Sequence, residues 1–315
     1  MTNMLRADMH VHTSHSTECR TLRFLGSRDC YSRPQDVYRT AKARGMDLVA
    51  ITDHDSIDGA LELLAARPRA GDVIVGEEVS CRFPNGDIEV HLGVYGMTEL
   101  LHRELQPLRR NVFEVTARLR EAKVFFALNH LFHFYRGQTP LADYLRLLDQ
   151  VPALEVRNGT MLPAHNQLIE QIAAGWTSAG PSRLGTIGGS DAHTLRRIGR
   201  TWTSAPGRTR EEFMSSLRQG LGQPGGEHGG ATAIAGDAYG VVARYLASLV
   251  GFGPRDHRAW RRAGCLAFGA VSLPFQFMPI VVAAAGKSRE RRAVEHVSGH
   301  GAVPSPAVAQ AASQE

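Results

Sequence analysis

Cysteine is scarce in this chain of 315 residues, which contains only four, and none of them forms a Cys-x-x-Cys pair. That number and spacing do not fit a disulfide scaffold. The sequence also opens without the positively charged and apolar segment that is typical of a secretory signal. These absences argue against a small secreted domain held by disulfides, and we expect a cytoplasmic protein.

Most of the chain also lacks an excess of positive charge. Residues 253–292 carry eight Lys or Arg and two acidic residues, a net charge of +6, whereas the whole chain has a net charge of +5. The remaining residues therefore sum to −1. A protein that follows a phosphate backbone needs a basic surface, so we expect no stable nucleic-acid partner.

The pattern of short apolar runs predicts the fold class. Between residues 7 and 203, β-branched runs alternate with helical patterns, which is typical of a mostly parallel sheet. About seven such repeats predict a closed α/β barrel of the TIM type. We expect a barrel domain over residues 1–205, a C-terminal helical appendage over 206–298 and a disordered tail over 299–315.

The expected elements follow from periodicity and from helix start and stop signals. We expect strands at residues 7–11, 47–52, 73–80, 88–94, 124–128, 153–156 and 184–188. Helices are expected at 34–44, 56–67, 100–122, 141–148, 164–174, 210–219 and 238–252, with a glycine-rich linker over 220–230.

Polar side chains gather where the expected strands end. His10 and His12 are two residues apart, so on a strand they share one face, and Asp191 and His193 repeat this spacing. The carboxyl ends of barrel strands meet on one face. Imidazole and carboxylate together suit Zn, Mn or Fe, and this pattern therefore predicts a metal site.

Further candidate ligands end other strands. His54, His91 and His130 each close a separate strand, and Glu77 competes with Glu78 because only one of two neighbours on a strand faces the site. We interpret His133 and His165 as outer or surface histidines.

The order of these motifs resembles a known family. The motifs are Asp8-Met9-His10-Val11-His12, Thr52-Asp53-His54-Asp55, Gly76-Glu77-Glu78-Val79-Ser80, His91, His130 and Gly189-Ser190-Asp191-Ala192-His193. Over about residues 5–205 they resemble the PHP (polymerase and histidinol phosphatase) family of metal-dependent phosphoesterases. The resemblance implies a distorted (β/α)7 barrel and two or three divalent ions, Mn, Zn or Fe.

The resemblance also implies a ligand set. A first ion is held by His10, His12, Glu78 and Asp191, and a second by Glu78, His91 and His130. A third ion is held by His54, His193 and a residue in the loop after His12. Glu18 falls at the spacing where the family usually has His or Asp, and His15 is the rival for this role.

The implied reaction is the hydrolysis of a phosphate ester by a hydroxide that bridges two ions. We expect Asp191, Glu78, His193 and Arg157 to be catalytic, with Arg157 as a phosphate contact and Arg196 or Arg197 as alternatives. The expected substrate is a small phosphorylated metabolite or nucleotide. The alternatives are a short-oligonucleotide nuclease of the same chemistry and a membrane-associated protein with a structural or regulatory metal site.

The C-terminal region contains a stretch without charge. Residues 263–286 form 24 such residues between basic flanks, which exceeds the roughly 20 that a spanning helix needs. Pro274 and Pro279 interrupt this stretch. The alternative is a helical hairpin of residues 238–252 and 263–286, packed on the barrel or in peripheral contact with an anionic membrane. Any membrane association is expected through residues 238–286.

Overall fold

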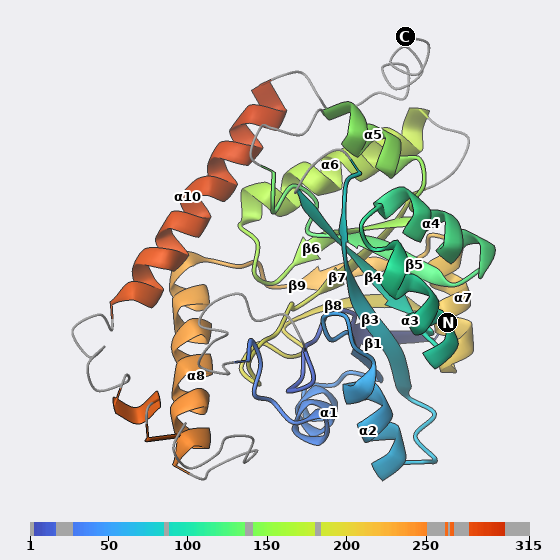
Figure 1. Ribbon diagram of the computed structural model, residues 1–315. Helices are drawn as coiled ribbons and strands as arrows, with labels where there is room; N and C mark the ends of the chain where they lie inside the picture. Colours follow the sequence, from blue (N-terminus) through green and yellow to red (C-terminus); the bar gives the residue numbers. More distant parts are fainter. Residues whose placement is uncertain are drawn as a thin grey trace.

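The fold is described here from a computed structural model (Figure 1). The structure describes residues 3–16, 28–84, 88–135, 141–179, 184–250, 262–263, 265–267 and 277–299. A nine-stranded sheet lies at the centre, in the order β7-β6-β5-β4-β3-β2-β1-β8-β9. The strands are β1 (Met4–Asp8), β2 (Leu48–Ile51), β3 (Val73–Arg82), β4 (Glu89–Tyr95), β5 (Phe125–Asn129), β6 (Ala153–Asn158), β7 (Gly185–Gly189), β8 (Thr201–Pro206) and β9 (Gln223–Gly226).

The sheet curls until its two edges meet. Residues of β7 contact both β8 and β9, and the backbone N–H of Gly188 donates to Thr203 Oγ1 at 2.7 Å. Thr186 Oγ1 donates to the carbonyl of Gly222 at 3.1 Å. These side-chain bonds replace a regular ladder at the seam. The predicted α/β barrel is confirmed, in a nearly closed form.

Strand number and direction differ from the prediction. The pairs β1–β2, β2–β3, β5–β6 and β6–β7 are parallel, whereas β3–β4, β4–β5, β1–β8 and β8–β9 are antiparallel. Only six residues separate β3 from β4, too few for the crossover that parallel neighbours require. The expected linker over 220–230 instead contributes β9, because its extended backbone pairs with β8. The domain boundary expected at residue 205 falls inside β8.

Helices cover the outside of the sheet (Figure 1). They are α1 (Pro34–Ala43), α2 (Asp58–Ala66), α3 (Glu99–Leu105), α4 (Val112–Glu121), α5 (Leu141–Leu148), α6 (Pro163–Ala179) and α7 (Arg210–Arg218). The single helix expected over 100–122 is broken into α3, the short 3-10 helix η2 (Gln106–Leu108) and α4. Pro107 lies in the break, and Asn111 starts α4 by accepting a hydrogen bond from Phe113 N at 3.1 Å.

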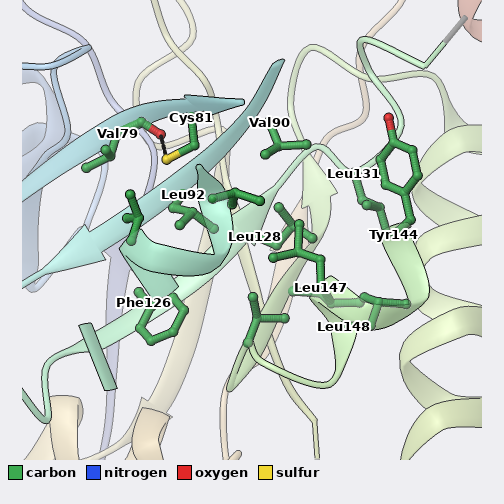
Figure 2. Packing of buried hydrophobic residues seen from close by; sticks show 14 of the residues in the cluster. Val79, Cys81, Val90, Leu92, Phe126, Leu128, Leu131, Tyr144, Leu147 and Leu148 are labelled. Atoms are coloured by element: carbon green, nitrogen blue, oxygen red, sulfur yellow. Dashed lines mark hydrogen bonds between the residues drawn. The ribbon is translucent and has the colours of Figure 1, made fainter. Parts of the chain in front are cut away.

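The largest core lies between the sheet and these helices (Figure 2). On β3, Val79 and Cys81 point into this core, and on β5, Phe126 and Leu128 do the same. Successive strand residues face opposite sides. Side chains one position away, such as Glu78, therefore point into the barrel.

Two more helices, α8 (Ala231–Leu249) and α10 (Met278–Gly299), form the appendage. They pack against each other, and α10 also packs on α6. Among the described residues, none of the helices has both the length and the apolar character needed for a membrane span. Much of the uncharged stretch 263–286, including 268–276, lies outside the described residues. The expected hairpin is therefore described only through α8 and α10.

Candidate metal centre

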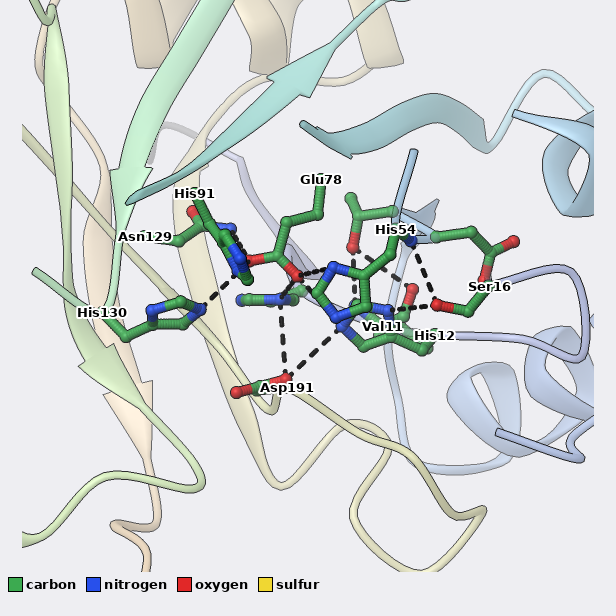
Figure 3. A network of polar contacts seen from close by, with 12 residues as sticks. Val11, His12, Ser16, His54, Glu78, His91, Asn129, His130 and Asp191 are labelled. Atoms are coloured by element: carbon green, nitrogen blue, oxygen red, sulfur yellow. Dashed lines mark hydrogen bonds and ion pairs between the residues drawn. The ribbon is translucent and has the colours of Figure 1, made fainter. Parts of the chain in front are cut away.

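The polar side chains at the strand ends meet at one end of the barrel (Figure 3). The segment after β1 runs beside the segment after β7, where Val11 forms a parallel bridge to Ala192. A Cβ atom at Gly189 would lie 2.3 Å from His10 Cβ, so only glycine permits this approach. The carboxylate of Asp8 connects the two segments by accepting a hydrogen bond at 2.8 Å from the backbone N–H of Ser190, which directly follows β7.

Glu78 lies at the centre of the cluster and is fully buried. Five histidine rings surround it, at 2.9 Å (His10 Nε2), 3.3 Å (His12 Nε2) and 3.2 Å (His54 Nδ1) from Oε2, and at 3.2 Å (His91 Nδ1) and 3.1 Å (His130 Nε2) from Oε1. Each carboxylate oxygen therefore faces its own set of histidines, as a bridging ligand requires.

Asp191 faces the same histidines from the opposite side (Figure 3). Its Oδ1 lies 3.6 Å from His10 Nε2 and 3.4 Å from His12 Nε2, while Oδ2 accepts a hydrogen bond from Thr160 Oγ1 at 2.9 Å. The backbone of Asp191 has a φ of 51°, in the left-handed region that is uncommon for residues other than glycine. Such conformations cluster at functional sites.

Asp29 completes a further group that the sequence analysis missed. Its Oδ2 lies 3.6 Å from His193 Nε2 and 3.9 Å from His54 Nε2, and Ser16 Oγ donates to it at 2.9 Å. The ring of His12 stacks on His193 with centroids 4.3 Å apart. Asp29 and Glu18 are the two acidic residues between Thr13 and Arg33. Asp29 could therefore have been found by treating both acidic residues as candidate ligands, but the spacing usual in the PHP family favoured Glu18.

The residues fit divalent ions. Six histidines and three carboxylates form four overlapping groups whose ligand atoms lie within 4.8 Å of one another: His10, Glu78 and His130; His10, His12 and Asp191; His54, Glu78 and His91; and His12, Asp29, His54 and His193. His12 Nε2 and Asp29 Oδ1 are buried and make no hydrogen bond among the described residues. A buried polar atom without a partner is costly, and a cation between the two sets of ligands satisfies both atoms.

Outer carboxylates hold the ligand rings in place. Glu155 Oε1 lies 2.9 Å from His10 Nδ1, and Glu89 Oε1 lies 2.7 Å from His91 Nε2. Each leaves the opposite ring nitrogen directed at Glu78. Carboxylates in this position fix the tautomer and orientation of metal-binding histidines.

The surroundings keep the central carboxylates ionised. Burial raises the pKa of Glu78, but the surrounding histidines, His10 first, outweigh it and hold the pKa well below its usual value. The pKa of Asp29 falls to about 2, because its contacts with the nearby histidines, His193 first, exceed the effect of burial. These groups are anionic at neutral pH, as cation ligands must be.

The histidines respond in two directions. Burial lowers the pKa of His12, yet the nearby carboxylates of Asp191 and Glu78 raise it to about 9. For His54, burial and neighbouring imidazoles hold the pKa well below its usual value. A proton on His12 therefore competes with a cation for the ring nitrogen, whereas His54 is available as a neutral ligand.

Sequence comparison places the chain among known proteins. Residues 164–221 match the model of the family described as PHP-associated. The resemblance to the PHP family is thereby confirmed for this segment. An uncharacterized protein of Methanocaldococcus jannaschii is 33% identical over 76 residues, which are 24% of this chain and 44% of that protein. The match thus spans less than half of the relative.

Two solved structures are similar to this one. PsfC from Pseudomonas syringae has a TM-score of 0.52 at 22% identity, over 77% of this chain and 98% of that one. It shares the fold. A two-domain protein of Bacteroides vulgatus, described as containing a predicted PHP-like metal-dependent phosphoesterase, has a TM-score of 0.48 at 16% identity, over 72% of this chain and 66% of that one.

Of the ligands that the PHP resemblance implies, the structure brings together His10, His12, His54, Glu78, His91, His130, Asp191 and His193. Glu18, expected for the third group, lies outside the described residues. Its rival His15 points away, with Nε2 2.7 Å from Glu62 of α2. Asp29 takes the place beside His54 and His193 because the chain returns to the site at the end of the loop.

Arg157 does not lie with the cluster. A register shift between Glu155 and Arg157 interrupts the ladder of β6 with β7, so the two residues do not share a face. Glu155 meets His10, whereas Arg157 Nη1 donates to the carbonyl of Gly226 in β9 at 3.2 Å. The phosphate contact expected for Arg157 therefore needs correction.

Three other residues lie outside the inner set. Glu77 points to the helix layer, where its Oε2 lies 2.8 Å from His102 Nδ1, and burial first of all raises its pKa to about 7. His165 is buried and donates to the carbonyl of Leu131 at 2.6 Å. His133 is exposed, with its ring 5.2 Å from that of His130.

Proposed function

We propose that this protein is a phosphoesterase that uses divalent ions to hydrolyse a phosphate ester of a small metabolite or nucleotide. The observation that carries the proposal is the arrangement around buried Glu78, whose two oxygens face different histidines within overlapping ligand groups. The match of residues 164–221 to the family described as PHP-associated supports a metal-dependent hydrolase.

The PHP resemblance implies which residues would hold the ions. Glu78 would be shared between an ion at His10, His12 and Asp191 and another at His91 and His130. A third would be held by His54 and His193, with Asp29, which lies in one group with them, as the further ligand. Mn, Zn and Fe suit this donor set. Divalent ions supply charge neutralisation for a phosphoryl group and lower the pKa of bound water.

The protein's own residues position the reaction. Glu155 and Glu89 orient ligand rings, and Thr160 orients Asp191. His193 is the most exposed of the ligand histidines, with a side-chain exposure of 27%, against 0% for His12 and 9% for His54. The substrate therefore enters beside His193.

The test is a hydrolysis assay on the full chain. Protein stripped of metal and reloaded with Mn²⁺, Zn²⁺ or Fe²⁺ is expected to hydrolyse p-nitrophenyl phosphate, bis-p-nitrophenyl phosphate or both, and Glu78→Gln is expected to be inactive. The ratio of the two substrates separates a monoesterase from a diesterase. Stoichiometric metal binding without turnover of either ester, or of a short oligonucleotide, would overturn the proposal in favour of a structural or regulatory metal site.

A further inference from the structure

A cavity adjoins the candidate metal centre on the side where His193 is exposed. It has a volume of about 240 Å³ and lies between α8, the start of α1 and the loop after His193. His193 belongs both to the wall of this cavity and to the ligand group with Asp29. His193 therefore connects the metal ligands to the cavity, and a molecule whose phosphate reaches these ligands lies next to it.

The cavity is lined by three arginines from three different segments. Arg33 precedes α1, Arg196 follows His193, and Arg244 belongs to α8. Within the described part of the chain, no carboxylate lies within ion-pair distance of any of these guanidinium groups. The acidic residue in the lining, Asp36, is paired with Arg39. The cavity is consequently cationic, and guanidinium groups bind phosphate and carboxylate through paired hydrogen bonds.

Helix α8 is fixed in place as one wall of the cavity. Asp237 accepts a hydrogen bond from Thr194 Oγ1 at 2.9 Å, and its Oδ2 lies 3.6 Å from Nε of Arg197. Arg197 is buried and also donates to the carbonyl of Gly159, so this anchor continues into the barrel. The appendage is therefore joined to the residues that directly follow the ligand His193.

Two glycines shape the face of α8 that borders the cavity. Gly236 and Gly240 are four residues apart and so lie on one face of the helix. A Cβ atom at Gly236 would lie 3.2 Å from Arg196 Nη1, and one at Gly240 would lie 3.2 Å from a methyl carbon of Thr194. Side chains at these positions would fill the space beside Arg196, and the glycines keep it open.

We propose that this cavity binds a second anionic group of the substrate, carried on the part of the molecule that leaves when the phosphate ester is hydrolysed. This inference rests on the proposed phosphoesterase function and specifies its substrate class: esters that bear a phosphate or carboxylate separate from the scissile phosphate. The three arginines bind the second phosphate or carboxylate, and the metal centre binds the scissile phosphate.

The experiment compares matched substrates and variants. The substrates are ω-carboxyalkyl phosphates and their neutral amides, with release of inorganic phosphate as the readout. In the Mn²⁺-loaded wild-type protein, the carboxylates are expected to have at least about tenfold higher kcat/KM than the amides, because charge-assisted hydrogen bonds are among the stronger ones. Arg33→Gln, Arg196→Gln and Arg244→Gln are each expected to remove most of this preference. Arg244→Lys is expected to restore part of it.

Arg120→Gln is the matched control, because Arg120 is exposed on α4 and lies outside the lining of the cavity. Equal turnover of carboxylates and amides by wild-type protein would overturn the inference while leaving the phosphoesterase function intact. Absence of turnover of every ester would instead refute the proposed function. Calorimetric binding of the corresponding phosphonates, which are not hydrolysed, tests the cavity separately: unchanged affinity in all three Arg→Gln variants would overturn it.

Discussion

Polar side chains are buried in the barrel, whereas apolar side chains are exposed in the appendage. His10, His12 and Glu78 have exposed fractions of 0%, while Ile280 and Val282 of α10 have 53% and 59%. Burying an imidazole or a carboxylate is costly unless each atom has a partner. Exposing a row of aliphatic side chains forgoes hydrophobic stabilisation. We propose that each departure from ordinary burial is compensated by a binding partner, a cation in the barrel and an apolar or membrane surface at the appendage.

The two regions meet at a buried ion pair. Lys287 of α10 pairs with Glu290, and its Nζ donates to the carbonyl of Thr160 at 2.6 Å. Thr160 in turn donates to Asp191. The appendage is thus connected to a candidate metal ligand through Thr160, and the following experiments separate what each region contributes.

The largest effect is expected from the shared carboxylate. Glu78→Gln should lower bound metal by more than one equivalent and reduce activity by more than about 100-fold. Mutation of residues that merely hydrogen-bond to metal ligands already lowers metal affinity or activity by about 10–100-fold. Asp191→Ala and His12→Ala should also abolish activity with the barrel still folded. Elemental analysis and circular dichroism check both points.

Glu77→Gln is the matched control for Glu78→Gln, because Glu77 is the adjacent buried glutamate and contacts His102 instead of the cluster. If Glu77→Gln lost metal while Glu78→Gln kept it, the assignment of the two faces of β3 would be reversed.

The next effect concerns the group around Asp29. Asp29→Asn should remove about one equivalent of metal and lower activity by roughly 10–100-fold, because it replaces an anionic ligand between His54 and His193. His15→Gln should leave metal content unchanged, since His15 contacts Glu62. Loss of that equivalent in Glu18→Gln, with Asp29→Asn normal, would restore the ligand set implied by family spacing.

These residues show how far the sequence alone reaches. The spacing of two residues between His10 and His12 predicted that they share one face of a strand. The positions of His54 and Asp191 at strand ends predicted that these distant residues converge. Both predictions follow from the regular geometry of strands. Asp29 was missed because loops have no fixed period that links spacing to position. Arg157 was misplaced for a related reason: a single register shift in β6 changes the face, and no residue pattern announces it.

Metal binding should depend on pH. His12 has a pKa raised to about 9 by Asp191 and Glu78 against the effect of burial, so it is protonated without metal below that pH. Binding must release this proton. Apparent affinity for Mn²⁺ should therefore rise between pH 6 and 9, by up to about tenfold per pH unit for each proton released. Calorimetry in buffers of different ionisation enthalpy measures this release, and a flat profile would contradict the protonated state of His12.

A smaller effect is expected where the appendage meets the barrel. Lys287→Met leaves Glu290 without its cationic partner, and loss of one member of a buried pair costs about 3–5 kcal/mol. Thermal unfolding should show a lower Tm, and Lys287→Met combined with Glu290→Leu should recover part of it. Arg289→Gln, at an exposed neighbouring position, should change stability by less than about 0.5 kcal/mol. Equal Tm values for Lys287→Met and Arg289→Gln would show that the ion pair does not fasten α10.

The smallest effect is expected from the exposed aliphatic row of α10, and it tests the predicted membrane contact. Ile280, Val281 and Val282 are exposed, and basic residues follow them in the same helix. Apolar area combined with positive charge favours the surface of an anionic bilayer. Full-length protein should therefore co-sediment with vesicles of phosphatidylcholine and phosphatidylserine at low salt, and salt should weaken this binding. The variant Ile280→Ser, Val281→Thr, Val282→Thr should bind less while keeping its metal content. If wild-type protein stayed in the supernatant at low salt, the row would instead be an apolar contact for another protein surface, because its exposure in water is otherwise unfavourable.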